Sequence, residues 1–236
     1  MQQTYVIYFN IFTATQIVST NLTSVSITNN VIITSTPNIT FNVHGNVNIV
    51  AAPSKPNPVI SINGTNSYIE MHTTQGQSCI TDVDKCTSGF TFSIDINFHV
   101  LVDNTFIVSS GGNLDNHKGI ALFYSNNQLH YIVTTSTFTW TLVVNYKPVF
   151  NVWQHFDLTW NYNLGVEVLV NGHVLGNNGR PNPSQGSQTK ALCVACSHGT
   201  VNVNVGMLVT GIISWSLDRT ALVNAGILPG IICVHC

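Results

Sequence analysis

The chain has 236 residues, which is enough for one large β domain or for a domain of about 170 residues with an extension. Hydrophobic residues make up 44% of it, whereas Asp, Glu, Lys and Arg together make up only 7%, and the formal net charge is -2. This composition provides no basic surface for nucleic acid or anionic lipid, and no apolar run is long enough for a membrane span. Weak charge also removes repulsion between copies, so it favours association.

Helix signals are nearly absent, and short runs of β-branched and aromatic residues recur along the chain instead. Asn, Gly and Pro divide these runs, a pattern that is typical of an antiparallel sandwich or barrel. The fold class predicted from this pattern is all-β. The runs lie at residues 24–34, 39–50, 89–102, 104–110, 119–133, 137–146, 153–162, 165–176 and 200–216.

The N-terminal run TYVIYFNIF is apolar on both faces of a predicted strand. Tyr5, Ile7, Phe9 and Ile11 occupy one face, while Val6 and Tyr8 keep the other face apolar. Such a strand requires cover on both sides. It either completes the chain's own sandwich or adds to the sheet of another copy, which would make a homo-oligomer or a fibre.

The sequence AAPSKPNPV, at Ala51 to Val59, contains three prolines that interrupt any strand. It predicts an extended connector. The predicted organisation is an N-terminal strand segment at residues 1–57, which is the candidate donor strand, and a main domain at residues 58–236 with a C-terminus tethered by disulfides.

Six cysteines fall in three close pairs, an arrangement that suits disulfides in an oxidising compartment. The pairs are Cys79 with Cys86, Cys193 with Cys196, and Cys233 with Cys236. Oxidised bridges that pin the C-terminus to the Cys193 loop are expected, and a four-thiolate zinc site made by the last two pairs is the alternative. The glycosylation sequons at Asn21, Asn38 and Asn63 agree with export. We therefore expect a secreted or cell-surface glycoprotein.

The stretch NVWQHFDLTWNYNLGVEVLVNGHVLG, residues 151–176, concentrates polar and aromatic side chains. Strand alternation from Gln154 to Trp160 places Phe156 and Leu158 on a buried face. His155 and Asp157 then share the opposite face, close enough for a mutual hydrogen bond. The pair Asn171-Gly172 predicts a two-residue hairpin turn that joins residues 167–170 to residues 173–176.

Three segments resemble the laminin G-like and pentraxin-like branch of the concanavalin A-like jelly rolls. They are CITDVDKCTSGFTFSIDINF from Cys79, VWQHFDLTW with VEVLVNG from Val152, and GIISWSLDRTAL from Gly211. The resemblance covers roughly residues 58 to 230 and departs from the family at Asp95 or Ile96, where a tryptophan is common. It implies an antiparallel jelly-roll β-sandwich, with Trp153, Trp160 and Trp215 in core positions. Trp140 is also expected in the core, with a sugar platform as the alternative.

The resemblance also implies calcium at a rim of the sandwich, through loop carboxylates and amides. The candidate ligands are Asp103, Asn104, Asp115 and Asn116, and Asx turns that cap these loops are the alternative interpretation. No other cofactor is expected.

No catalytic residues are predicted, because the chain lacks a GxSxG elbow and its only glutamates, Glu70 and Glu167, form no acid pair. The predicted function is a non-catalytic extracellular structural or adhesive protein that assembles with itself. The alternative is a calcium-assisted module that recognises carbohydrate or extracellular protein.

Overall fold

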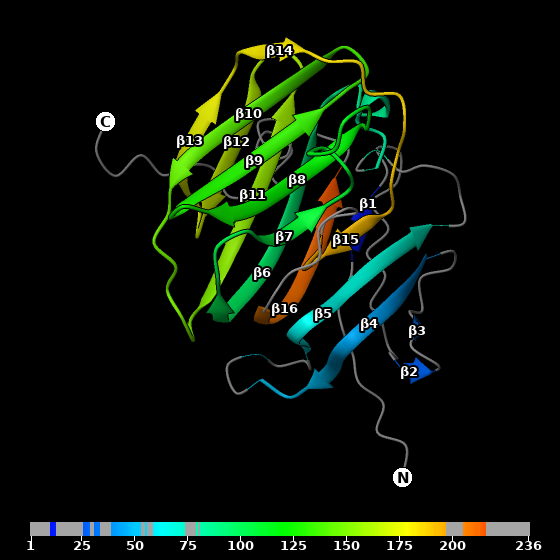
Figure 1. Ribbon diagram of the computed structural model, residues 1–236, viewed down its shortest axis with the longest axis vertical. Coiled ribbons are helices and arrows are strands. Elements are labelled where there is room, and N and C mark those ends of the chain that lie inside the picture. Colours follow the sequence, from blue (N-terminus) through cyan, green and yellow to red (C-terminus); the bar gives the residue numbers. More distant parts are fainter. Residues whose placement is uncertain are drawn as a thin grey trace.

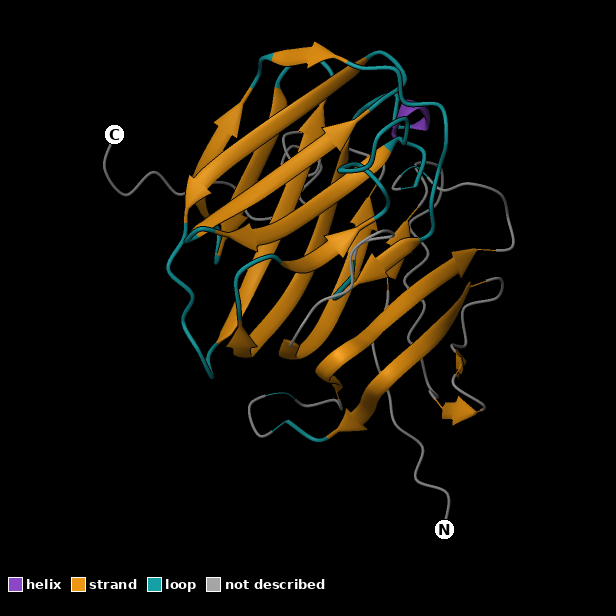
Figure 2. Ribbon diagram, in the orientation of Figure 1, coloured by secondary structure: helices purple, strands orange, loops and turns teal. Residues whose placement is uncertain are grey.

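The computed structural model describes residues 10–12, 26–28, 31–33, 39–52, 55, 59–73, 79, 81–196 and 205–215. Strands are the main secondary structure of these residues, and the only helical element among them is one short 3-10 turn, η1 (Val83–Lys85), as Figure 2 shows. The predicted all-β fold class is confirmed. The described part of the chain contains no helix of the length and hydrophobicity that a membrane span requires.

Sixteen strands are found in the described residues. They are β1 (Asn10–Phe12), β2 (Ser26–Thr28), β3 (Val31–Ile33), β4 (Ile39–Val50), β5 (Val59–Thr73), β6 (Phe90–Leu101), β7 (Thr105–Ser109), β8 (Gly119–Ser125), β9 (Gln128–Thr134), β10 (Phe138–Asn145), β11 (Trp153–Asn161), β12 (Gly165–Val170), β13 (His173–Asn178), β14 (Pro181–Pro183), β15 (Leu192–Val194) and β16 (Val205–Trp215).

The strands form one curled sheet, and twelve of them follow each other in the order β13-β12-β11-β6-β16-β5-β15-β7-β8-β9-β10-β14. The sheet folds back on itself, so that β10 packs against β12 and β13. Figure 1 shows β7 to β10 as a layer in front of β6, β11 and β12. Gly176 of β13 lies so close to β10 that an added Cβ would meet Val144 Cγ1 at 2.6 Å. The two ends of the sheet therefore form the two layers of a sandwich.

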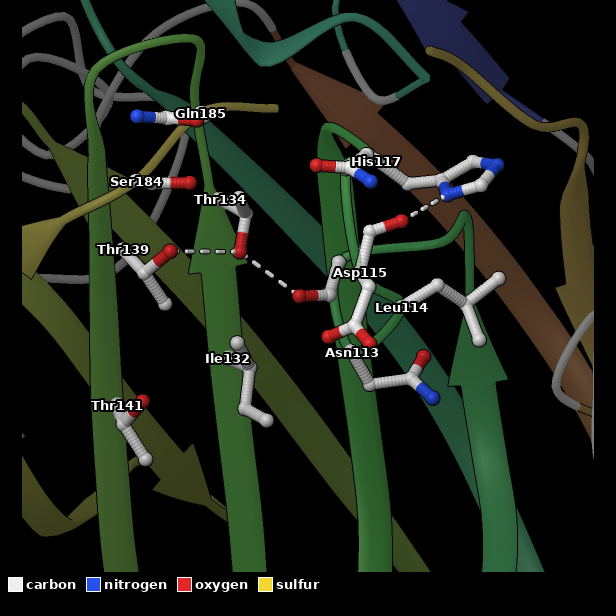
Figure 3. Close-up of a pocket in the computed structure, with 12 residues that line it drawn as sticks. Asn113, Leu114, Asp115, His117, Ile132, Thr134, Thr139, Thr141, Ser184 and Gln185 are labelled. Atoms are coloured by element: carbon white, nitrogen blue, oxygen red, sulfur yellow. Dashed lines mark hydrogen bonds between the residues drawn. The ribbon is translucent and has the colours of Figure 1, made fainter. Parts of the chain in front are cut away.

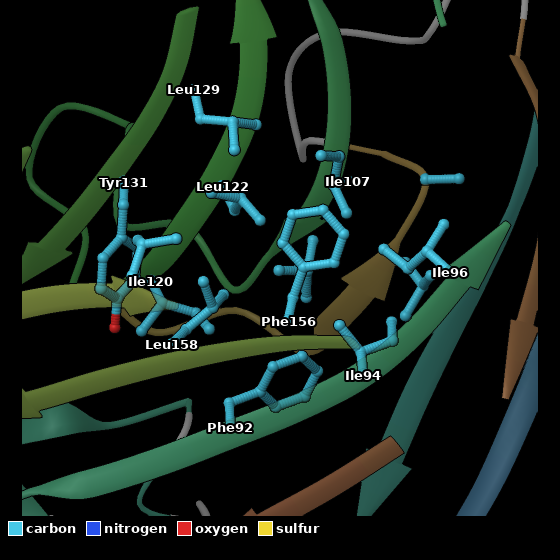
Figure 4. Close-up of a cluster of buried hydrophobic side chains, with 14 of the residues drawn as sticks. Phe92, Ile94, Ile96, Ile107, Ile120, Leu122, Leu129, Tyr131, Phe156 and Leu158 are labelled. Atoms are coloured by element: carbon cyan, nitrogen blue, oxygen red, sulfur yellow. The ribbon is translucent and has the colours of Figure 1, made fainter. Parts of the chain in front are cut away.

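The hydrophobic core lies between these layers (Figure 4). Strand β6 contributes every second residue to it, and these side chains are fully buried: Phe90, Phe92, Ile94, Ile96 and Phe98. Strand β11 follows the predicted alternation, because Phe156, Leu158 and Trp160 are buried in the same core.

The tryptophans divide between the core and the opposite face. Trp140 is fully buried and meets Trp160 edge to face, with ring centroids 5.4 Å apart, so the expected core position of both is confirmed. The predicted core position of Trp153 is wrong. This residue is opposite Asn97 in the register, on the outward face of β11, and Lys55 Nζ lies 4.8 Å from the centroid of its ring. Strand alternation is the reason, since residues 154, 156, 158 and 160 point inward. The side chain of Trp215 lies outside the described residues.

Asparagine occurs at many of the positions where the backbone has a positive φ. Seven asparagines among the described residues have positive φ: Asn66, Asn104, Asn116, Asn126, Asn127, Asn151 and Asn171. Asparagine tolerates this left-handed conformation better than most residues do. The predicted turn at Asn171-Gly172 is confirmed, with φ of 52° and 78°. The turn joins β12 to β13, which pair antiparallel with one bulge. The many asparagines of this chain therefore serve its turns as well as its polar surface.

The N-terminal strands join the same sheet as the rest. Strand β4 pairs antiparallel with β5 across the predicted connector, and β1 pairs in parallel with the end of β16, where Ile11 is opposite Ser214. Tyr5, Ile7 and Phe9 lie outside the described residues. The division of the chain near residue 57 and the donation of the strand to a neighbour stay predictions.

Two of the predicted cysteine pairs are disulfides, Cys79–Cys86 and Cys193–Cys196. The second bridge corrects both expectations for the C-terminal end. Because Cys193 and Cys196 are bonded to each other, neither can tether the C-terminus or supply a thiolate to zinc. Cys233 and Cys236 lie outside the described residues.

Candidate functional site

A charged cluster occupies the outward face of β6 and β11. His155 donates from Nδ1 to Asp95 Oδ1 at 2.6 Å and from Nε2 to Asp157 Oδ1 at 3.2 Å. Lys55 Nζ donates to the second oxygen of Asp95 at 2.8 Å, and the buried Ser93 hydroxyl donates to Asp157. The predicted bond between His155 and Asp157 is confirmed. Asp95 completes the cluster, because it accepts from both His155 and Lys55.

The pKa values in this cluster follow from its contacts. Hydrogen bonds to Asp157 and then to Asp95 raise the pKa of His155 to about 9. Burial opposes ionisation of Asp95, but the hydrogen bonds from His155 and Lys55 outweigh burial and hold the pKa of that carboxyl below its usual value. His155 is therefore charged at neutral pH, and the cluster balances two cations with two carboxylates.

This arrangement does not suit a nucleophile and its base. Both ring nitrogens of His155 donate to carboxylates, so neither offers a lone pair to a hydroxyl. The nearby serine hydroxyl, that of Ser93, is bonded to Asp157 rather than to the imidazole. The cluster instead links β6, β11 and the connector residue Lys55.

The four candidate calcium ligands lie at opposite ends of β7. Asp103 accepts a bond from the backbone N–H of Asn126, and Asn104 Oδ1 accepts one from Ser125 Oγ at 2.8 Å. This pair thus fixes two neighbouring turns to each other. Asp115 and Asn116 follow β7 and are exposed. Among the residues that the structure describes, no group of three His, Cys, Asp or Glu side chains is placed to hold a metal. Calcium at either pair stays a prediction.

An open pocket of about 520 Å³ lies beside Asp115, on the outward face of β9 and β10 (Figure 3). The loop between β7 and β8 forms one wall, and the segment after β14 forms another. Most residues that line it carry neutral hydroxyls or amides: Asn113, Asn116, Thr134, Thr139, Thr141, Ser184 and Gln185.

Hydrogen bonds within the pocket determine which of its side chains can donate to a ligand and which can accept. Thr134 Oγ1 donates to the carbonyl oxygen of Gly112 at 2.7 Å and lies 3.1 Å from Thr139 Oγ1. Because the Thr134 proton is committed to Gly112, Thr139 is the donor in the bond between the two threonines, and its lone pairs can accept from a ligand. The side chains of Thr141, Ser184 and Gln185 have no hydrogen-bond partner within the described part of the chain, so they can both donate and accept.

Of the residues that line the pocket, Asp115 and Asn116 were predicted as ligands from the sequence, and the threonines were not. A signal for them was present, because Thr137, Thr139 and Thr141 alternate with Phe138 and Trp140. That alternation places hydroxyls on the outward face of a strand. Gln185 and Ser184 come from a distant loop, and only the fold brings them to the same place.

The three predicted glycosylation sites differ in how far the structure describes them. Asn63 lies in β5, and its side-chain amide donates to Ser61 Oγ at 2.7 Å. Asn21 and Asn38 lie outside the described residues. Glycosylation stays a prediction at all three.

No protein-family model and no curated protein sequence matches the chain. Among solved structures, it is similar to receptor-binding domains of botulinum neurotoxins. The binding domain of serotype D/C matches with a TM-score of 0.60 at 12% identity, over 87% of this chain and 51% of that one. The neurotoxin DC domain in complex with SialylT matches with a TM-score of 0.58 at 14% identity, over 87% and 51%. The same domain with rat synaptotagmin II gives 0.57 at 15% identity, over 85% and 50%.

At such identities the likeness shows the fold alone, which is a β-rich fold. The chain spans about half the length of these neurotoxin domains. The narrower assignment to laminin G-like or pentraxin-like domains stays a prediction.

Proposed function

We propose that the chain is a non-catalytic recognition module, and that it binds a glycan in the pocket between the β7–β8 loop and β10. The observation that carries this proposal is the pocket of about 520 Å³ with its neutral hydroxyl and amide lining. A sugar presents many hydroxyls that both donate and accept, and such groups are recognised by neutral partners of the same kind. Secretion or display at the cell surface, as expected from the disulfides, would give the site access to glycans.

The structural neighbours support a binding role. One of them is described in complex with SialylT, another with rat synaptotagmin II, and a third depends on two ganglioside molecules for cell entry. These ligands belong to those proteins. They support the general class, carbohydrate or protein recognition, for a chain of the same fold.

A glycan array probed with the intact chain tests the proposal, followed by titration calorimetry of the glycans that bind. The variant Thr139→Val removes the acceptor without changing the size of the side chain, and it should weaken binding about tenfold, the equivalent of one hydrogen bond. Asn163→Ala, in the exposed turn between β11 and β12, is the control and should bind normally. A glycan site in this pocket would be refuted if no glycan binds, or if Thr139→Val binds a glycan as tightly as Asn163→Ala does.

Self-assembly through the N-terminal strand is a second proposal. Its support is the apolar character of both faces of residues 5–11 and the low charge of the chain. The pairing of β1 with β16 involves three residues within one chain, and such a short strand can be exchanged between copies. The neurotoxin domains give no support to filaments. Deletion of residues 1–20 should leave monomers, and assemblies that persist unchanged by electron microscopy would reject strand donation.

A further inference from the structure

A row of aromatic and aliphatic side chains crosses the outward face of the front layer, next to the pocket. Four residues on neighbouring strands are in register: Phe106 of β7, Phe123 of β8, His130 of β9 and Val143 of β10. The rings of Phe106 and Phe123 are 4.9 Å apart, and those of Phe123 and His130 are stacked at 4.6 Å. We call these four residues the cross-strand row. Phe106 is buried at one end, the next two are half-buried, and Val143 is 44% exposed at the other.

The cross-strand row and the pocket lie on the same face of the sheet. On β9, His130, Ile132 and Thr134 share a face because they are two residues apart, and on β10 the same holds for Val143, Thr141 and Thr139. Successive rows are about 7 Å apart along a strand, so the cross-strand row lies roughly 13 Å from Thr134 and Thr139. A ligand that reaches from one to the other must contain more than one sugar ring.

This combined surface is amphipathic and nearly free of charge. Its lining contains no lysine or arginine among the described residues, and the carboxylate of Asp115 lies at its rim. Lys118, on the loop that forms one wall of the pocket, is bound to Asp82 at 2.6 Å and to Asp84 at 3.2 Å. An acidic sugar would therefore meet no lysine or arginine in the lining of the pocket, and it would meet a carboxylate of its own sign.

Sugar rings have an apolar face of C–H groups and a rim of hydroxyls, and this surface offers a counterpart for each. We propose that the pocket and the cross-strand row form one extended site for a neutral oligosaccharide, and that Asp115 discriminates against sialylated forms. The hydroxyls of the ligand meet the threonines, and its apolar ring faces cover Val143 and the outer edges of Phe123 and His130. This inference rests on the proposed glycan-binding function and specifies its ligand class.

The test uses the intact chain on an array that pairs neutral tetrasaccharides with their sialylated counterparts. Neutral members should bind at least tenfold more tightly than the sialylated ones. Asp115→Asn should raise the affinity for sialylated members and leave the neutral ones unchanged. Preferential binding of the sialylated forms by the unaltered chain would overturn the discrimination.

The cross-strand row is tested by Val143→Ser, a change at an exposed position that the fold tolerates. It should lower the affinity for a bound tetrasaccharide about three- to tenfold and leave the affinity for its terminal monosaccharide unchanged. Phe123→Ala, once shown to be folded by near-UV circular dichroism, should have the same effect.

If both variants bind the tetrasaccharide normally while Thr139→Val weakens it, the extended site is wrong and the proposed function stands. If no glycan binds at all, the proposed function fails, and the extended site fails with it.

Discussion

The charged cluster on β6 and β11 predicts that the chain loses stability between neutral and alkaline pH. The pKa of His155 is raised from its ordinary value of 6.5 to about 9 in the folded chain. A group whose pKa is raised by folding stabilises the fold fully below its unfolded value, and this contribution disappears as the pH passes through the folded value. The contribution of His155 to the stability of the fold is therefore lost between about pH 6.5 and pH 9.

The magnitude follows from the same two values. A pKa difference of about 2.5 corresponds to about 3.4 kcal/mol. The imidazole is 42% exposed, however, so solvent screens its contacts with both aspartates. Discounted for this exposure, the contribution of His155 to the free energy of unfolding is about 1–2 kcal/mol.

Urea denaturation without reductant measures the free energy of unfolding at each pH, with the fluorescence of the buried Trp140 and Trp160 as the signal. Between pH 6.5 and pH 9 the free energy of unfolding should fall by about 1–2 kcal/mol more in the unaltered chain than in the variant His155→Asn, which has no imidazole at this position. The variant His173→Asn changes an exposed histidine on β13 and is the control. If His155→Asn shows the same pH dependence as the unaltered chain, the histidine is not held charged by its aspartates.

The packing predicts two further results, each with a matched comparison. Phe156→Ala, in the centre of the core, should cost about 3–5 kcal/mol in unfolding free energy, whereas Leu164→Ser, at a position 64% exposed, should change it by no more than about 0.5. Similar midpoints for the two in urea would contradict the core assignment. Gly165→Ala should destabilise far more than Gly172→Ala. Both glycines have positive φ, but only at Gly165 would the new Cβ meet a backbone atom, Asn178 O at 2.1 Å. Thermal melting of the two variants compares them directly, and equal Tm values would argue against this close approach of β12 and β13.

The sequence was most informative where the pattern within a single strand is enough to predict which side chains are buried. In β11 the alternation alone assigned Phe156 and Leu158 to the core and placed His155 beside Asp157, and the turn at Asn171-Gly172 followed from the two residues that accept positive φ. The same alternation, applied one residue earlier, would have placed Trp153 outside. That error came from the family pattern, which expected a tryptophan in the core.

The cysteines show a limit of the same kind. Their spacing indicated disulfides, but it did not determine which partner each cysteine takes. Cys193 and Cys196 lie on either side of a tight turn, where Ala195 has a φ of 65°, and this local geometry brings the two sulfurs together. A bridge to the C-terminus was equally consistent with the spacing.

The candidate site could not be assembled from the sequence. Its threonines lie on β10 and at the end of β9, Asp115 on the loop after β7, and Gln185 more than forty residues beyond Thr141 on the segment after β14. Each is an ordinary polar residue in its own segment, and no spacing motif joins them.

The sequence by itself determined the all-β class, the buried faces of the strands and several turns, because these depend on the period-two alternation and on the conformational preferences of asparagine and glycine. Only the tertiary structure decided which polar faces meet. The curling of the sheet and the register between distant strands bring Asp95 to His155, and Gln185 into the same pocket as Thr139. Such an arrangement depends on chain topology rather than on any local preference.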